Sequence, residues 1–387
     1  LVFVGYGIVA PERNWNDYAN TDVTDKTVII LVNDPGYATQ DPAVFDGNAM
    51  TYYGRWTYKY EEAARQGAAA AIIVHETGPA GYGWEVVNNS WTGPQIGLSA
   101  SNLNGDLAEI EGWITQETAE AVFDGAGLSY TQLKQAAAQP GFTAIPMADL
   151  TLNVSIENSV RTSLSQNVLA AIPGTTRPEE TIIYTAHWDH LGIDPTLEGD
   201  QIYNGASDNA TGTAGLLALA QLHTQVPAPE RTVVFLAVTA EESGLLGSQW
   251  YAEHPVYPIA STVANINMDN MNTVGRTHDV VVVGAGSSEL EKYLADAAGR
   301  QGRYVQSEPN PERGYYYRSD HFNFAKVGVP ALYAEAGEDN IEFGRDYGAA
   351  QAEDYTENRY HQPGDEYRES WDLSGAAEDL RLYFDIG

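Results

Sequence analysis

The chain has 387 residues, 43% of them hydrophobic and 11% aromatic, which is enough apolar surface for folded cores and excludes a disordered or fibrous protein. Acidic residues outnumber basic ones by 53 to 20, which disfavours binding to nucleic acids and to anionic membrane surfaces, because both need clustered Lys and Arg. Cysteine is absent, so disulfides, thiolate metal sites and cysteine nucleophiles are excluded and any metal must be held by histidine and carboxylate.

The formal net charge of −33 allows two interpretations, a strongly solvated surface or adaptation to salty water, and the low count of lysine leans toward the second. No run of 18 or more apolar residues occurs, so no membrane-spanning segment is expected. The chain starts directly on an apolar stretch with no basic region before it. We therefore expect a processed or trimmed product, exported to the periplasm or outside the cell rather than cytoplasmic, whose signal segment is not present in this chain.

A chain of this length is expected to form two domains, and its pattern of predicted strands and helices changes near residue 147. Strands are predicted at residues 27–32 and 68–74, among turns rich in Gly, Pro and Asn, with an amphipathic helix at 58–66. Helix-like pieces follow from about 110 to 147. We expect residues 1–147 to form a β-rich domain with a helical extension, and residues 148–387 to form the second domain.

From residue 148 onward, strand-like runs alternate with helical segments. Strands are predicted at residues 181–186, 233–240, 263–268, 280–283 and 329–334, and an Ala/Leu-rich helix at 214–223. This alternation predicts an α/β domain with a mostly parallel central sheet flanked by helices. Function in such a sheet collects at the carboxyl ends of the strands.

Residues that can bind a metal follow three of these strands. The first strand runs into His187 and Asp189, the second into Glu241 and Glu242, and the third ends at Asp269. Taken alone, each acid is more simply a solvated loop residue or helix cap, and a lone histidine a local hydrogen-bonding group. The adjacent carboxylates, however, repel each other unless a cation or a proton lies between them. Their convergence on one edge of the sheet predicts a metal site.

A Gly-rich loop at residues 204–212 opens the Ala/Leu-rich helix and places Asp208 near its start. Zinc binds imidazole and carboxylate, and a catalytic zinc site keeps one position open for water. A pair of metals needs one bridging carboxylate and two terminal ligands each, and a further carboxylate beside them can accept a proton from the bridging water. Asp189, two residues after His187, is placed to orient its imidazole.

Several segments resemble the co-catalytic zinc aminopeptidase and glutamate carboxypeptidase family, in its subgroup with a protease-associated domain. The matching segments are Ala-His-Trp-Asp at 186–189, Gly-Ala-Ser-Asp-Asn-Ala-Thr-Gly at 205–212, Ala-Glu-Glu-Ser-Gly-Leu-Leu-Gly-Ser at 240–248, Asn-Met-Asp at 267–269, Arg-Ser-Asp-His at 318–321 and Tyr-His at 360–361. Residues 58–74 resemble the protease-associated domain. The resemblance implies a zinc exopeptidase (phosphorylase/hydrolase-like) fold for residues 148–387, with an inserted protease-associated domain.

The resemblance also implies a role for each residue of the site, with two zinc ions as cofactors. Asp208 would bridge the zinc ions and Glu241 would be the general base. The terminal ligands would be His187 and Asp269 at one zinc, and Glu242 and His361 at the other. The hydroxyl of Tyr360 would stabilise the tetrahedral oxyanion.

Four further residues are expected beside the metals or the substrate. These are Asp189, Asn209, Arg318 and His321. The family has a cis peptide after the bridging aspartate, so the bond between Asp208 and Asn209 is predicted to be cis. Arg318 has an alternative as a structural ion pair.

The function implied is that of a metallo-exopeptidase, an aminopeptidase that hydrolyses N-terminal residues from peptide substrates by a zinc-bridging hydroxide with a Glu general base. One alternative is a carboxypeptidase of the glutamate carboxypeptidase type, which the scarcity of Arg and Lys disfavours. Another is a glutaminyl cyclase-like transferase, which uses one metal and would not need all five ligands. The third is a non-catalytic binding protein of the same fold, whose site would be eroded. No nucleic-acid or membrane partner is expected, and the oligomeric state stays open.

Overall fold

The computed structural model describes residues 1–91, 93–98, 107–147 and 150–387. The chain forms two compact units, of which unit 1 comprises Leu1–Val87, Leu98–Ser163 and Asn310–Tyr317, and unit 2 comprises Asn88–Gly97, Leu164–Pro309 and Arg318–Gly387. Each unit therefore draws on segments that are far apart in the sequence. Among the described residues, none of the helices combines the length and hydropathy that a membrane span requires.

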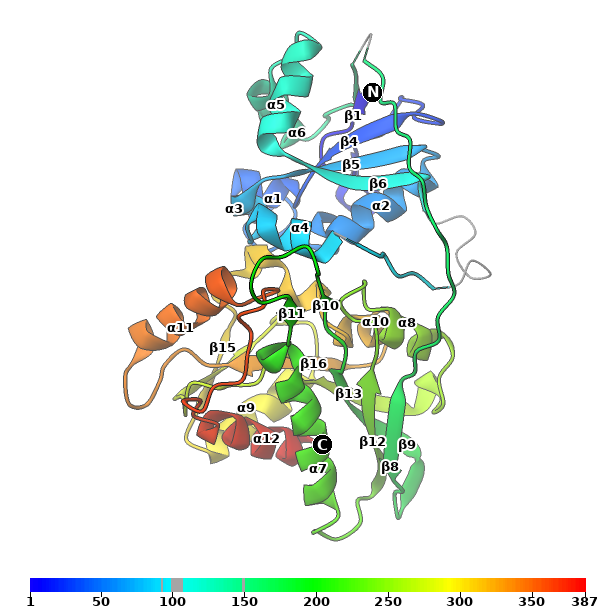
Figure 1. The fold of residues 1–387 in the computed structure, drawn as a ribbon. Helices are drawn as coiled ribbons and strands as arrows, with labels where there is room; N and C mark the ends of the chain where they lie inside the picture. Colours follow the sequence, from blue (N-terminus) through cyan, green and yellow to red (C-terminus); the bar gives the residue numbers. More distant parts are fainter. Residues whose placement is uncertain (92, 99–106, 148–149) are drawn as a thin grey trace. The chain divides into compact units, whose positions relative to one another are not determined.

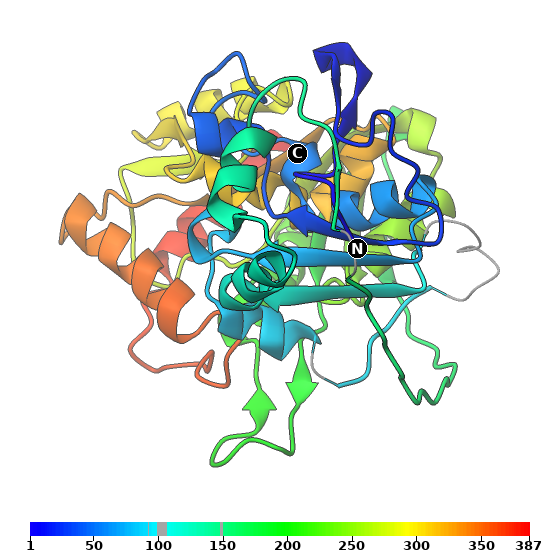
Figure 2. The ribbon, with the colours of Figure 1, turned by 90° about the horizontal axis from the view of Figure 1, so that it is seen from above.

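Unit 1 is built on a five-stranded sheet in the order β6-β5-β4-β1-β7, as far as the described residues show. Its strands run parallel except β7, which pairs antiparallel with β1 at the edge. Side chains alternate between the two faces, as a strand requires. In β4, Ile29 and Leu31 join a cluster with α5 and α6, whereas Val28 and Ile30 join one with α2. Helices therefore cover both faces of this sheet (Figures 1 and 2).

The elements of unit 1 agree with the prediction at β4, α2 and β5, whereas β6 is a strand at the start of a segment that was expected to be helix-like. Their bounds are β1 Val2–Phe3, β2 Val9–Ala10, β3 Trp15–Asn16, β4 Thr27–Leu31, α1 Pro35–Thr39, α2 Trp56–Arg65, β5 Ala70–His75, α3 Thr77–Ala80, β6 Ile110–Thr115, α5 Gln116–Gly125, α6 Tyr130–Ala137 and β7 Ile145–Pro146. Helix α4, Trp84–Trp91, contains the boundary between the segments assigned to the two units.

Unit 2 contains a seven-stranded sheet in the order β15-β14-β16-β13-β9-β12-β8, counted over the described part of the chain. Strands β16, β13, β9 and β12 run parallel to one another, and β14 is parallel to β15. The β14–β16 and β12–β8 pairs are antiparallel. The predicted α/β domain with a mostly parallel central sheet is confirmed.

The bounds of the elements in unit 2 follow in chain order. They are β8 Val168–Ile172, β9 Arg177–His187, β10 Gly192–Ile193, β11 Ile202–Tyr203, α7 Thr211–His223, β12 Arg231–Val238, α8 Leu246–Glu253, β13 Thr262–Asn267, β14 Asp279–Val282, α9 Leu290–Arg300, β15 Tyr304–Ser307, α10 His321–Lys326, β16 Ala331–Ala336, α11 Arg345–Asn358 and α12 Ser374–Ile386.

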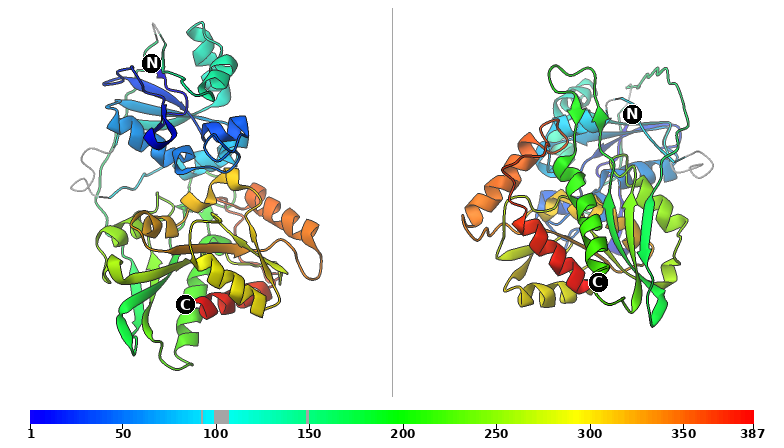
Figure 3. Two further views of the ribbon diagram at one scale, coloured as in Figure 1. Left: turned by 180° about the vertical axis from the view of Figure 1, so that it is seen from behind. Right: turned by 60° about the horizontal axis from the view of Figure 1, so that its bottom comes forward.

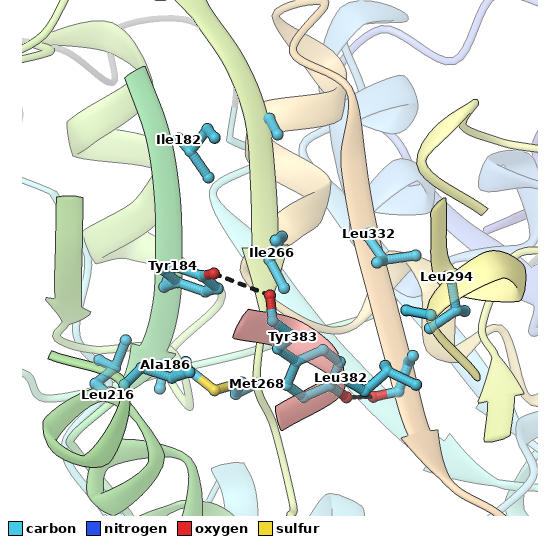
Figure 4. Close-up of a cluster of buried hydrophobic side chains, with 14 of the residues drawn as sticks. Ile182, Tyr184, Ala186, Leu216, Ile266, Met268, Leu294, Leu332, Leu382 and Tyr383 are labelled. Carbon is cyan, nitrogen blue, oxygen red and sulfur yellow. Dashed lines mark hydrogen bonds between the residues drawn. The ribbon is translucent and has the colours of Figure 1, made fainter. Parts of the chain in front are cut away.

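Two apolar cores lie on the two faces of this sheet. On one face, Ile182 and Tyr184 of β9 pack in a cluster with residues of α7, α9 and α12 (Figure 4), and Figure 3 shows α7 and α12 crossing there. On the other face, Ile183 packs with residues of α8 and α10. Tyr184 donates a hydrogen bond from its hydroxyl to the carbonyl of Tyr383 at 2.9 Å. Full burial of an aliphatic side chain such as Leu382 contributes about 1.5–3 kcal/mol to stability.

The parallel strands bring three chain segments to one edge of the sheet. Strand β9 ends at His187, which pairs in register with Val238 at the end of β12. On its other side, β9 pairs with β13, whose last residue is Asn267. Because parallel strands end at the same edge, the residues that follow these strands start close together.

Candidate metal centre

His187 supplies the first imidazole of the site and is almost fully buried, with 1% of its surface exposed. Its Nδ1 lies 3.1 Å from the carbonyl oxygen of Asp189. A carbonyl only accepts, so this contact places the proton on Nδ1 and leaves Nε2 as the metal-binding atom. Nε2 lies 3.0 Å from Asp208 Oδ1 and 3.4 Å from Asp269 Oδ1, and no hydrogen-bond donor or acceptor satisfies it in the described residues.

His361 supplies the second imidazole, and its backbone is left-handed with φ of 56°. Its Nε2 lies 3.0 Å from Glu242 Oε2 and 3.5 Å from Asp208 Oδ2. Its Nδ1 lies 3.1 Å from Ser90 Oγ, and the side chain of Asn89 donates to its backbone carbonyl at 3.2 Å. Both contacts come from the segment Asn88–Gly97, which belongs to unit 2. As at His187, the contact at Nδ1 leaves Nε2 facing carboxylates.

Asp208 lies between the two imidazoles, with Oδ1 toward His187 and Oδ2 toward His361. This is the arrangement that a carboxylate bridging two metals requires. Its loop is held by Asp365, whose carboxylate accepts hydrogen bonds from the backbone N–H of Ser207 at 3.0 and 3.1 Å and from that of Asp208 at 3.0 Å.

The predicted cis peptide between Asp208 and Asn209 is present. Asn209 is buried, and its side chain donates to the carbonyl of Met268 at 3.0 Å. Its Oδ1 accepts from the backbone N–H of Gly212 at 2.9 Å. Asn209 therefore ties the loop to the start of α7 and to the end of β13.

The adjacent pair Glu241 and Glu242 is oriented by Asp189. The carboxylate of Asp189 accepts hydrogen bonds from the backbone N–H of Glu241 at 3.1 Å and of Glu242 at 3.3 Å. Its Oδ1 lies 3.8 Å from Nδ1 of His187, so the atom that orients this imidazole is the backbone carbonyl rather than the carboxylate. Ala240, just before the pair, has φ of 54°, a conformation that costs a non-glycine residue energy and gathers at functional sites.

Asp269 directs its two oxygens to different partners. Oδ1 faces His187, whereas Oδ2 accepts a hydrogen bond from Ser319 Oγ at 2.7 Å. Ser319 in turn accepts a hydrogen bond from the side chain of Asn267 at 2.7 Å. The orientation of this carboxylate is thus fixed from both sides.

Tyr360 and Arg318 come together beside the imidazoles. Arg318 Nη2 donates to the hydroxyl of Tyr360 at 2.8 Å, and the Tyr360 ring stacks on that of His361 with centroids 4.0 Å apart. Burial raises the pKa of Tyr360 well above its usual range, so the hydroxyl stays protonated and can donate to an oxyanion. His321 begins α10, is fully buried, and packs its ring 4.9 Å from that of Tyr333. It belongs to none of the possible metal-binding groups found among the described residues.

The electrostatics of the site favour a bound cation. Burial lowers the pKa of His361, but the carboxylates of Glu242 and Asp208 outweigh it and raise the value to about 10. Burial raises the pKa of Glu242, but the cationic His361 outweighs it and lowers the value to about 2. An imidazole surrounded by these carboxylates therefore holds a proton. A metal cation bound among the same carboxylates can replace that proton. Burial, together with neighbouring carboxylates, raises the pKa of Glu241 well above its usual value.

The donor set fits a pair of zinc ions. Imidazole and carboxylate are the ligands that zinc accepts in the absence of thiolates. Two donors on one tetrahedral zinc lie roughly 3.3 Å apart, given metal–ligand distances of about 2.0–2.1 Å. The donors here are separated by 3.0 to 3.5 Å, in two groups that share Asp208. Among the described residues, the groups of three close enough together to hold one metal are His187, Asp208 and Asp269; His187, Glu241 and Glu242; and His190, Asp208 and Glu242. His361 therefore approaches Asp208 and Glu242 in pairwise contacts, and His190 lies close to the same two carboxylates.

Four residues of this site were missed by the sequence reasoning: His190, Ser90, Ser319 and Asp365. His190 lies 2.6 Å through Nδ1 from Glu242 Oε1, and its signal was its place at the same strand end as His187. Ser319 lies inside the family-like segment at 318–321, which was its signal, whereas nothing near Ser90 and Asp365 in the sequence marks them.

Comparison with known proteins completes the description of unit 2. The family model described as Peptidase family M28 matches residues 167–384. Aminopeptidase YwaD of Bacillus subtilis (strain 168) is 32% identical over 111 residues, which are 28% of this chain and 22% of that protein. Aminopeptidase NAALADL1 of Mus musculus is 32% identical over 124 residues, 30% of this chain and 15% of that protein. The chain thus spans less than a quarter of the length of these relatives.

Among solved structures, an aminopeptidase from Aneurinibacillus sp. strain AM-1 aligns over 99% of this chain and 71% of that chain, with 20% identity and a TM-score of 0.48.

Proposed function

The chain belongs to peptidase family M28, whose model matches more than half of it, and from this premise we propose that it is a di-zinc metallo-exopeptidase acting as an aminopeptidase on peptide substrates. The observation that carries the proposal is the position of Asp208, whose two oxygens face two imidazoles at 3.0 and 3.5 Å. In the proposed site, His187 and Asp269 would hold one zinc, Glu242 and His361 the other, and Asp208 would bridge them.

The bound zinc ions would polarise the scissile carbonyl and lower the pKa of a water molecule between them. Glu241 is proposed as the general base that accepts a proton from the attacking water and returns it to the leaving amine. Its burial supports this role, because burial raises the pKa of this carboxylate well above its usual value and so increases its affinity for the proton of the attacking water.

The hydroxyl of Tyr360 is proposed to donate to the oxyanion that forms on the scissile carbonyl. Arg318 donates to the same hydroxyl oxygen at 2.8 Å, which directs the hydroxyl proton away from the guanidinium. Aminopeptidase action is supported by the scarcity of basic residues, 20 against 53 acidic ones, because a glutamate-specific carboxypeptidase would need several for its substrate carboxylates. A glutaminyl cyclase-like enzyme needs one metal, whereas two donor groups are in place around Asp208.

The proposal also covers the first domain and the location of the protein. We propose that residues 1–147 form a protease-associated domain, supported by the resemblance across residues 58–74, where α2 and β5 lie. We also propose that the protein is exported, which fractionation of the producing cells would test.

The proposal is tested by zinc content and by substrate choice. Elemental analysis should give two zinc ions per chain, and a panel of aminoacyl chromogenic substrates should be cleaved in preference to peptides with C-terminal glutamate. Chelation should abolish this cleavage and added zinc should restore it.

Substitution of Glu241 tests whether this residue acts as the general base rather than as a metal ligand. Glu241→Gln should lower kcat by about 10²- to 10⁴-fold, the usual contribution of a general base, with zinc content unchanged. Glu253→Gln, which alters an exposed glutamate at the end of α8, is the matched control and should keep full activity. Full activity of Glu241→Gln would refute its role as the base, and zinc-independent cleavage would refute the metallopeptidase.

A further inference from the structure

His190 lies three residues after His187, at the end of the same strand, and its side chain is 8% exposed. It has no role in the proposed reaction. We propose that His190 is a positioning residue that holds Glu242 in the orientation needed to bind the second zinc. This inference rests on the proposed function, because it requires the second zinc site.

The two oxygens of Glu242 face different imidazoles. Oε2 lies 3.0 Å from Nε2 of His361, whereas Oε1 lies 2.6 Å from Nδ1 of His190. Charge-assisted contacts between nitrogen and oxygen are short, about 2.7–2.9 Å, and the separation here is 2.6 Å. It is shorter than the roughly 3.3 Å between two donors that share one tetrahedral zinc. His190 therefore contacts the carboxylate itself, and Oε2 is the oxygen left for the metal.

Neither atom of this contact, nor Nε2 of His190, has a hydrogen-bond partner in the described parts of the chain, so the two side chains meet as an ion pair. Glu242 is 5% exposed on its side chain, so water does not readily replace the imidazole. Without His190, Oε1 would be a buried carboxylate oxygen that has lost the imidazole facing it, and a buried charge without its partner is costly. The carboxylate would then be free to turn away from His361.

The position of His190 is itself fixed by the loop that carries Asp208. Gly205 has φ of 58°, and a Cβ added to it would lie 2.6 Å from Cγ of His190. The His190 ring also meets the ring of His361 edge to face, with centroids 5.9 Å apart. The contact between His190 and Glu242 is thus held by the backbone on one side and by a proposed metal ligand on the other.

Zinc titration of the metal-free full-length protein tests the inference, with the affinities of the two zinc equivalents resolved by calorimetry and by competition with a chelator. In His190→Ala the second equivalent should bind about 10- to 100-fold more weakly, the usual effect of removing a residue that orients a ligand, while the first is unchanged. His190→Asn places an amide N–H near the position of Nδ1 but lacks the second ring nitrogen, so it should recover most of the affinity. His278→Ala, which removes an exposed histidine, is the control.

Each other outcome overturns the inference. Equal weakening in His190→Ala and His190→Asn would mean that His190 binds zinc directly or acts only through packing. Unchanged affinity in both variants would mean that Glu242 needs no such support. A wild-type protein that takes up fewer than two zinc ions would refute the proposed function as well, so the two failures can be told apart. Circular dichroism of the metal-free variants confirms that they fold. If His190→Ala does not fold, His190→Leu, which fills the space without a nitrogen facing Oε1, takes its place and should weaken the second equivalent in the same way.

Discussion

Replacement of Asp365 by asparagine isolates the support of the bridging carboxylate without touching a proposed ligand. Asp365 is 1% exposed and accepts hydrogen bonds from two consecutive backbone N–H groups, those of Ser207 and Asp208, at 3.0 to 3.1 Å. Asparagine keeps the shape and one acceptor oxygen, but turns an N–H group toward one of these backbone donors. Both backbone N–H groups would then lose a charged acceptor, and that of Ser207, which contacts both oxygens, would also face the amide N–H at the former Oδ1 position.

The loss can be estimated from these contacts. A hydrogen bond to a charged group contributes about 1.5–3 kcal/mol and one between neutral groups about 0.5–1.5 kcal/mol, so each of the two backbone donors loses about 1–2 kcal/mol when its acceptor becomes neutral. Asp365→Asn should therefore lower the free energy of unfolding by about 2–4 kcal/mol. For a unit of this size that corresponds to a fall in Tm of roughly 5–15 °C.

Differential scanning calorimetry of the zinc-loaded protein measures this change. Glu366→Gln alters the neighbouring exposed carboxylate and should stay within about 0.5 kcal/mol of the wild type, as surface substitutions do. The reasoning is refuted if Asp365→Asn unfolds within 1 kcal/mol of the wild type, or if Glu366→Gln is destabilised as much.

Three further changes have defined outcomes. Gly205→Ala should cost about 1–3 kcal/mol by chemical denaturation and weaken zinc binding, because its Cβ would lie 2.6 Å from both the carbonyl oxygen of Asp208 and Cγ of His190. Gly192→Ala, also at positive φ but with open space around it, should show only the backbone cost. Burial lowers the pKa of Lys59 to about 7 while its ammonium donates to the carbonyl of Tyr6. The unfolded chain binds this proton more tightly, so urea denaturation should show stability rising from about pH 7 to 10 in the wild type but less in Lys59→Met. Chelation should lower the Tm of unit 2 in calorimetry, since metals that bind only the folded state stabilise it.

Much of unit 2 could be predicted from its sequence, because strands that are buried on both faces of a parallel sheet consist of continuous runs of apolar residues. Strands β9, β12 and β13 were found in this way. Helix α11 was not, because only Gly348 of its 14 residues is buried and no apolar stripe marks it. Strand β15, Tyr304–Ser307, is half-exposed and mixed in composition, and it was missed for the same reason.

The residues of the site also differ in how far the sequence alone predicts them. Residues that follow strand ends could be suspected from position alone, but the choice among them depended on family resemblance. Ser90 is the clearest case of what neither could supply. It contacts His361 across 271 positions of sequence, and a serine in a polar helix carries no sign of that contact. Only the folded chain shows which hydrogen-bonding residue faces which imidazole.

The contacts around the proposed ligands follow one pattern that the ligands alone do not reveal. Asp269 gives one oxygen to the imidazole side of the site and the other to Ser319. Glu242 does the same with His361 on one side and His190 on the other. Asp208, which presents both oxygens to imidazoles, is held through its backbone instead. Each carboxylate is thus oriented by a protein group on the side away from the proposed metal, so the donors can meet zinc without first losing conformational freedom.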